Sequence, residues 1–221
     1  MRVVPQRFFY AFVSCARGKG VSYFWKQKIE VRSLLLFVDA AVRQASRTRR
    51  LSQALLSQLG GEVVHLRLAE VSLPALDEKR LLWRSGCCER GDFSDSYFDL
   101  ARQFAAADTI VIAAPFWDLS FPALLKQYLE HICVTGLTFR YSPEGIPIGL
   151  CKARRLYYVT TSGGPIYDDS FGFGYVKALS QQLFGIADCR CIKAENLDIV
   201  GNDAEAILAE AISCITDTWN E

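Results

Sequence analysis

The feature that most constrains the fold is a regular alternation of short apolar runs with segments of helical periodicity, repeated five times from Ser33 onward. Ser33–Asp39 reads SLLLFVD, a continuous apolar run typical of a strand that is buried on both faces. Such an alternation predicts an α/β protein with a parallel sheet covered by helices on both sides. The predicted strands are 33–39, 62–68, 109–114, 155–160 and 188–194.

Helical segments lie between and after these strands. The first passes through Leu51 and Leu59 and ends at Gly60-Gly61. Ser94 is the expected N-cap of a helix that reaches Ala107, and Ser120 with Pro122 is expected to open the next one. Two further helices are predicted at 175–184 and 203–218, a short hairpin at 138–150, and a long connection with one helical turn near Leu81 at 69–91.

Length and composition describe a folded chain. With 221 residues, of which 51% are hydrophobic and 22% charged, the protein has material for one domain with a full core. The net charge of +1 gives no support to a nucleic-acid-binding face or to an acidic carrier surface. The cluster Arg43, Arg47, Arg49 and Arg50 is therefore interpreted as a solvated turn.

No metal or membrane site is predicted. The eight cysteines include no C-x-x-C pair, and His65 and His131 have no partner at metal-ligand spacing. We expect buried free thiols in a reducing compartment, which indicates a cytoplasmic protein. No apolar run approaches the roughly 18 residues that a membrane span needs. Residues 1–30 are expected to form a weakly structured extension outside the domain, which then occupies residues 31–221.

Three loops follow the first, third and fourth strands, where ligands bind in open parallel sheets. Ser46-Arg47-Thr48 precedes a helix, so its hydroxyls and N–H groups would suit a phosphate, although such a segment taken alone more often serves simple helix capping. Phe116 and Trp117 would suit a flat ring or the core. Gly163-Gly164 would let the backbone approach a ligand or form an ordinary turn.

Taken together, these segments resemble the FMN-dependent NAD(P)H azoreductases and the related NAD(P)H:quinone reductases. The stretch VIAAPFWDLSFPALLKQYLEHI at 111–132 looks like the family segment APMYNF…LKNYFD. GLTFRY at 136–141 is similar to the family's GVTFRY, and Thr160–Gly164 to its TSRGG or TTGG. The matches occur in order at compatible spacings. The resemblance implies a flavodoxin-like three-layer sandwich with a five-stranded parallel sheet of order 2-1-3-4-5.

The resemblance also implies which residues bind FMN. The family's phosphate contacts fall on Ser46, Arg47 and Thr48. Its flavin-edge contacts fall on Phe116, Trp117, Asp118 and Leu119. Its second flavin loop falls on Thr161, Ser162, Gly163 and Gly164. The pattern has three departures. Ala40 replaces a phosphate-contacting serine, Asp118 replaces an asparagine beside the ring, and Ser162 replaces a ring-proximal arginine.

The implied activity is a ping-pong, two-electron reduction of quinones and azo compounds by NAD(P)H, with the hydride carried by the flavin rather than by a catalytic side chain. The family is homodimeric, and the apolar surplus of Pro122–Val134 fits either an interface or burial in its own domain. A flavodoxin-type electron-transfer protein and a flavin-free regulatory relative are the alternatives. Reduction of menadione without a separate reductase excludes the first, and a yellow purified protein excludes the second.

Overall fold

The computed structural model describes residues 8–10, 28–30 and 33–220. Within the first two ranges, β1 (Phe8–Tyr10) and β2 (Lys28–Glu30) pair as antiparallel strands. The rest of the predicted extension, residues 1–7 and 11–27, lies outside the described residues. That extension and the domain boundary therefore stay predictions.

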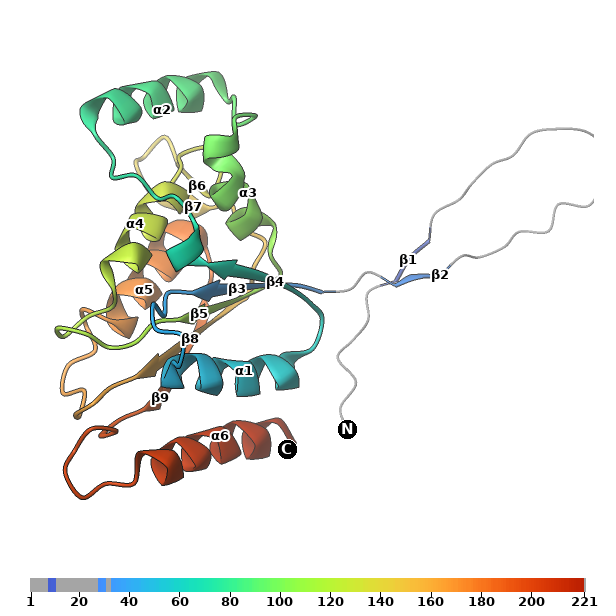
Figure 1. Ribbon diagram of the computed structural model, residues 1–221. Helices are drawn as coiled ribbons and strands as arrows, with labels where there is room; N and C mark the ends of the chain where they lie inside the picture. Colours follow the sequence, from blue (N-terminus) through green and yellow to red (C-terminus); the bar gives the residue numbers. More distant parts are fainter. Residues whose placement is uncertain (1–7, 11–27, 31–32, 221) are drawn as a thin grey trace, which may run out of the picture.

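A five-stranded parallel sheet forms the centre of the molecule (Figure 1). Its strands stand in the order β4-β3-β5-β8-β9, which is 2-1-3-4-5 when only these strands are counted along the chain. This confirms the predicted sheet and its order. The strands are β3 (Leu34–Asp39), β4 (Glu62–Arg67), β5 (Thr109–Ala113), β8 (Arg155–Thr161) and β9 (Asp188–Ala194).

Alternate residues of the central strands face two separate cores. Leu36 and Val38 of β3 belong to one core, while Leu35 and Phe37 belong to the other. All four side chains are essentially inaccessible to solvent. The continuous apolar run of β3 thus has the burial on both faces that its sequence predicts.

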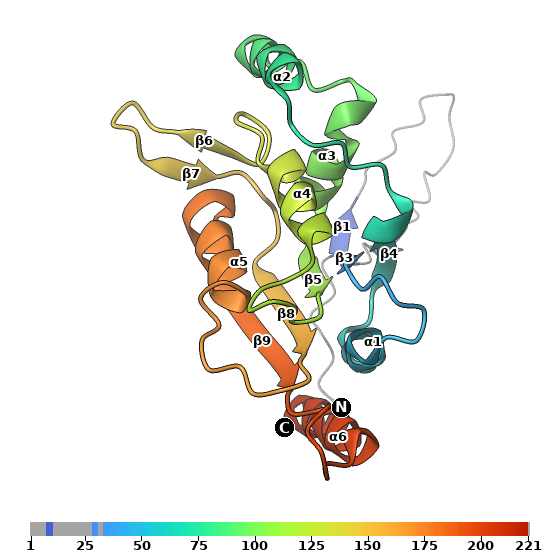
Figure 2. The ribbon, with the colours of Figure 1, turned by 60° about the vertical axis from the view of Figure 1, so that its left-hand side comes forward.

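Helices cover both faces of the sheet (Figures 1 and 2). One layer consists of α1 (Arg47–Leu59) and α6 (Ala204–Asn220). The opposite layer holds η2 (Ser96–Phe98), α3 (Asp99–Ala106), α4 (Ala123–Ile132), α5 (Phe173–Leu179) and η3 (Ser180–Phe184). The predicted hairpin is present as β6 (Phe139–Tyr141) and β7 (Pro147–Gly149).

The segment 69–91 differs most from the prediction. It contains η1 (Leu68–Glu70) and a full helix, α2 (Glu78–Arg90), in place of one helical turn. The Asp77 side chain accepts a hydrogen bond from the Arg80 N–H at the start of α2, and Gly91 ends it in a left-handed conformation. Among its side chains only Cys87 is buried, so the helix shows little of the apolar periodicity by which helices are recognised.

Two predicted caps are also wrong. Asp95, not Ser94, caps the turn that leads into α3, and the Ser120 hydroxyl donates to the Phe171 carbonyl instead of capping α4. The apolar surplus of α4 is mostly buried in its own chain, since Leu125, Tyr128 and Leu129 are inaccessible. In the part of the chain that the structure describes, no helix is long and apolar enough to cross a membrane.

Candidate functional site

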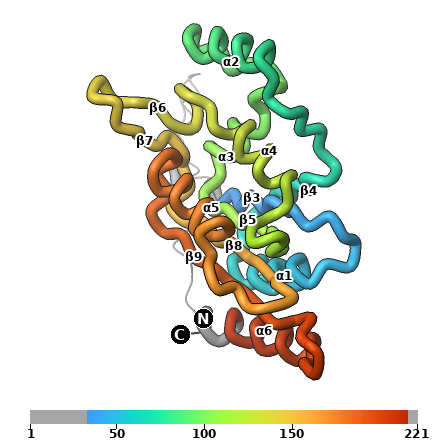
Figure 3. Tube along the Cα trace, turned by 90° about the vertical axis from the view of Figure 1, so that its left-hand side faces the viewer, coloured from blue at the N-terminus to red at the C-terminus, as the bar shows by residue number. Residues whose placement is uncertain are grey.

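The loops that follow β3, β5, β8 and β9 lie at one edge of the sheet, the left-hand edge in Figure 1 and the side that faces the viewer in Figure 3. Backbone hydrogen bonds continue past the strand ends and hold these loops together. The Ala40 N–H donates to the Ala113 carbonyl, and the Phe116 N–H donates to the Thr161 carbonyl. The edge predicted to carry the site is therefore the edge where the loops converge.

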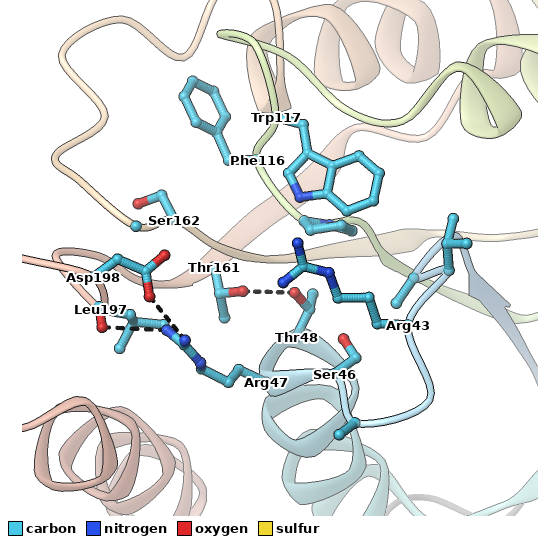
Figure 4. Close-up of a pocket in the computed structure, with 15 residues that line it drawn as sticks. Arg43, Ser46, Arg47, Thr48, Phe116, Trp117, Thr161, Ser162, Leu197 and Asp198 are labelled. Atoms are coloured by element: carbon cyan, nitrogen blue, oxygen red, sulfur yellow. Dashed lines mark hydrogen bonds and ion pairs between the residues drawn. The ribbon is translucent and has the colours of Figure 1, made fainter.

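A pocket of about 350 Å³ opens at this edge (Figure 4). Its volume falls within the roughly 300–1,000 Å³ of typical small-molecule sites. Most of the predicted residues line it: Ser46, Arg47, Thr48, Phe116, Trp117, Thr161, Ser162 and Gly163. Sequence reasoning missed the other lining residues: Ala41, Val42, Arg43, Ala45, Pro115, Leu197 and Asp198.

Asp118, Leu119 and Gly164 are absent from this lining. The chain reverses between Trp117 and Ser120, which exchange two backbone hydrogen bonds of 2.8 and 2.9 Å. Asp118 and Leu119 occupy the centre of that turn with φ of 50° and 67°, the pattern of a type I′ turn. Both side chains are exposed, so the carboxylate of Asp118 does not add charge to the pocket.

The start of α1 provides the polar floor of the pocket. The Ser46 hydroxyl oxygen caps the helix by accepting from the Arg49 N–H at 3.2 Å, and its own hydrogen stays available to donate. Thr48 is buried and shares a 2.6 Å hydrogen bond with Thr161 from the end of β8. Because α1 has no acidic residue in its first turn, its free N–H groups and dipole favour an anion here.

The loop before α1 is shaped by a buried ion pair that the sequence did not predict. Asp39 ends β3 with its side chain fully buried, and its carboxylate accepts from the Arg49 Nε at 2.6 Å. The remaining guanidinium nitrogens of Arg49 donate to the carbonyls of Ala41, Arg43 and Gln44 at 2.7–3.0 Å. One side chain thus fixes three carbonyl groups of the loop beside the pocket.

The loop after β9 closes the other side. The backbone of 196–198 pairs with that of 162–164, and the Asp198 carboxylate accepts from the Arg47 guanidinium at 2.8 Å. A Cβ on Gly163 would lie 2.5 Å from Asp198 Oδ2, whereas one on Gly164 would meet nothing within 4 Å. The space beside Gly163 is therefore taken by the Asp198 side chain and is not open space for a ligand. The Ser162 hydroxyl donates to the Gly164 carbonyl.

Aromatic side chains stand above the polar floor. Phe116 and Trp117 project from the loop after β5 over the upper part of the pocket (Figure 4). Trp117 is 38% exposed, so the face of a large ring is accessible beside the pocket. An apolar, partly open wall above an anion-binding floor suits a ligand that joins a planar ring to an acidic group.

Among the residues that the structure describes, the cysteines show no sign of a site of their own. Burial raises the pKa of the Cys88 thiol, so this thiol is not poised as a reactive thiolate. Burial also raises the pKa of Cys133 to about 11 and that of Cys191 to about 12. Over the described residues, no group of three or more histidine, cysteine or acidic side chains could hold a metal ion.

Fold and pocket together define a doubly wound α/β protein whose ligand site lies beyond the carboxyl ends of its strands. The chain belongs to the flavodoxin-like fold family, which it matches over residues 33–217. It is 36% identical over 193 residues to FMN-dependent NADH:quinone oxidoreductase 2 of Clostridium acetobutylicum, an alignment that covers 81% of this chain and 94% of the relative.

Other comparisons agree. FMN-dependent NADH:quinone oxidoreductase of Clostridium perfringens is 33% identical over 81% of this chain and 94% of its own length. The azoreductase structure from Bacillus anthracis strain Sterne has a TM-score of 0.72 at 24% identity, covering 85% of this chain and 99% of its own. An FMN-dependent NADH-azoreductase from the same species, crystallised with FMN, has a TM-score of 0.69 at 21% identity, with coverage of 85% and 98%. The structural likeness supports the fold.

Proposed function

We propose that this protein is an FMN-dependent NADH:quinone oxidoreductase that also reduces azo compounds. The observation that carries the proposal is the convergence of Thr48, Trp117 and Gly163, from three separate loops, on one pocket with an anion-binding floor and an aromatic wall. Clostridial relatives that align over most of their length carry the name of this activity. FMN bound in this pocket would supply two-electron hydride chemistry, so that NADH and the acceptor could use the same site in turn.

The floor of the pocket would hold the phosphate of FMN. The Ser46 hydroxyl and the N–H groups at the start of α1, Arg47 and Thr48 among them, provide donors directed at one anion. The Thr48–Thr161 hydrogen bond fixes the distance between α1 and β8, so the donors are positioned before a ligand arrives. Ala40, which replaces a phosphate-contacting serine of the family, is buried and does not line the pocket.

The aromatic wall of the pocket would hold the flavin ring of FMN. Phe116 and Trp117 offer aromatic faces, and Ser162 and Gly163 place backbone groups on the opposite side of the pocket. Such packing orients the ring for hydride transfer and keeps water away from one face. Asp118, Leu119 and Gly164 would act through the turns that they form, since they do not line the pocket themselves.

A homodimer would complete the site. Large apolar side chains are strongly exposed close to the pocket or on α2: Leu119 at 69%, Phe171 at 60% and Leu82 at 68%. Solvent-facing side chains of this kind mark association surfaces when they gather. Sedimentation of the purified protein at micromolar concentration should give twice the chain mass of 24.8 kDa. A single-chain mass would contradict the dimer.

Two further expectations belong to this proposal. Residues 31–221 would form the FMN-binding domain, with residues 1–30 as an extension outside it. A cytoplasmic location would keep the thiols reduced, and the cysteines of the described residues are all without disulfides.

The decisive experiment is to purify the protein, release the bound cofactor by denaturation and identify it chromatographically. We expect FMN and steady NADH oxidation with menadione and with an azo dye. A protein that carries FMN but needs a separate reductase would be an electron carrier, and a colourless protein that binds no FMN would overturn the proposal.

A matched pair of variants tests the phosphate floor. Ser46→Ala should weaken FMN retention, because it removes a pocket hydroxyl. Ser57→Ala is the control, since Ser57 is an exposed serine of the same helix whose hydroxyl bonds only to the Ala54 carbonyl. Equal FMN content in both variants would contradict the assignment of Ser46.

A further inference from the structure

The arginine cluster at the start of α1 divides into members with different partners. Arg47 is paired with Asp198, Arg49 with the buried Asp39, and Arg50 with Glu205 at 2.7 Å. These acids come from the loop after β9, the end of β3 and α6. The cluster is therefore not the solvated turn that the sequence indicated, because three of its members join α1 to other parts of the fold.

Arg43 differs from the other three. It has no acidic partner within 4.0 Å among the residues that the structure describes. It lines the pocket, and Figure 4 shows its guanidinium pointing inward, whereas that of Arg47 is bonded to Leu197 and Asp198 at the side of the pocket. The uncompensated side-chain charge of the pocket therefore belongs to Arg43 and not to Arg47.

The loop that presents Arg43 is held in place. Its own carbonyl accepts from the Arg49 guanidinium at 3.0 Å, and Arg49 is anchored on Asp39. The Ala41 N–H also donates to the Asp39 carboxylate at 2.9 Å. A long, flexible side chain on a fixed loop loses less conformational entropy on binding than one on a mobile loop.

The net positive charge of the pocket lining favours an anionic ligand. Asp198 is the one acidic side chain in the described lining, and Arg47 already neutralises it. What remains is the Arg43 charge and about half an elementary charge at the start of α1. Their sum, about +1.5, matches the charge of roughly −1.5 to −2 that a phosphate monoester carries near pH 7.

We propose that the Arg43 guanidinium binds the phosphate of the flavin cofactor and so sets the preference for FMN over riboflavin, while Arg47 contributes its backbone N–H and a link to Asp198. This inference rests on the proposed function. It assigns the charged contact to a residue outside Ser46-Arg47-Thr48, the segment to which the family resemblance assigns the phosphate contacts.

The test compares Arg43→Gln with Arg50→Gln, which removes a charge of the same sign from α1 while leaving the pocket lining intact. Apo protein is titrated with FMN and with riboflavin, and the quenching of flavin fluorescence gives both dissociation constants. We expect Arg43→Gln to weaken FMN binding about tenfold or more, as the loss of a charge-assisted hydrogen bond predicts. Riboflavin binding should change less than about twofold.

Arg50→Gln should change both constants by less than about twofold, and Arg47→Gln should weaken FMN binding less than Arg43→Gln does. Equal losses for FMN and riboflavin in Arg43→Gln would assign Arg43 to the ring and overturn the inference. An unchanged FMN constant would also overturn it. If the wild-type protein binds neither flavin, the proposed function itself fails, which is a distinguishable result.

Discussion

At the α1 end of the pocket, residues 41–48, the Arg49 guanidinium holds the loop carbonyls in place, whereas the aromatic end, residues 115–119, holds a left-handed turn with exposed apolar side chains. Asp39 and Arg49 fix the α1 end from inside the fold. Leu119, in contrast, has φ of 67° and is 69% exposed. The backbone of the α1 end is anchored within the chain, and the aromatic end has apolar surface still open to a ring or to a second subunit.

The difference between the two ends shows which part of such a pocket is rigid. A small anion needs fixed donors, so its end is built from buried charge and hydrogen bonds that exist before the ligand. A ring that exchanges substrates on one face needs access, so its end keeps unburied aromatic area. The four predictions below test this difference, in descending order of expected effect.

Asp39→Asn should cause the largest loss. It leaves the mostly buried Arg49 guanidinium without its counter-charge, which typically costs about 3 kcal/mol in the free energy of unfolding. Urea denaturation followed by circular dichroism measures this. Glu70→Gln, which breaks the exposed pair of Glu70 with Arg67, is the control and should have little effect. Similar midpoints for the two variants would mean that the α1 end is not held by its buried pair.

Gly163→Ala should destabilise the protein by about 1 kcal/mol, because the new methyl group would displace the Asp198 carboxylate and disturb its pairing with Arg47. Gly164→Ala is a close control, since its methyl group would meet nothing within 4 Å. The melting temperatures of both variants, measured by thermal unfolding, test this prediction. Equal melting temperatures would show that the two glycines are equivalent and that Asp198 does not restrict this loop.

Leu119→Gly should stabilise the monomer by up to about 1 kcal/mol, because glycine relieves left-handed backbone strain and completes the Asp-Gly sequence that type I′ turns prefer. Leu119→Ala removes the same exposed side chain but keeps the strain, so it should show no such gain. Unfolding is measured at a concentration where the protein is monomeric. A gain in both variants would locate the cost in the exposed side chain and not in the backbone.

Glu205→Gln should have the smallest effect on the stability of the protein, and only at pH values where Glu205 is ionised in the folded state. The hydrogen bond and charge of Arg50 hold the pKa of Glu205 below its ordinary value of 4.5. A lowered carboxyl pKa contributes stability that is present above pH 4.5 and is lost as the pH falls through the folded value. Urea midpoints from pH 3 to 7 should therefore show a small gap between wild type and variant that closes in acid. A gap that widens in acid would contradict this.

Much of the architecture could be predicted from local patterns. β3 and β5 are apolar runs of strand length, and Gly60-Gly61 marks the end of α1, so burial and backbone freedom specify these elements without tertiary information. The exception is α2. Asp77 and Gly91 were available as its start and stop signals, but a helix with one buried side chain lacks the periodicity that normally identifies it.

The candidate site was only partly predictable. Ser46, Trp117 and Gly163 were found because their loops follow strands of a parallel sheet, and such loops must meet at one edge. Asp198 was missed, since it follows β9, a strand whose loop has a lone Gly201 and no aromatic or hydroxyl residue, and it meets Arg47 across 151 positions of sequence.

The sequence by itself determined the alternation of elements, the order in which they come and the loops that carry polar and aromatic side chains, because each of these depends on residues that are neighbours along the chain. Only the tertiary structure decided which acid each arginine meets, since Asp39, Asp198 and Glu205 lie on different elements brought together by packing. That pairing distinguishes Arg43 from its neighbours, because a charge is available to a ligand only where the fold supplies no counter-charge.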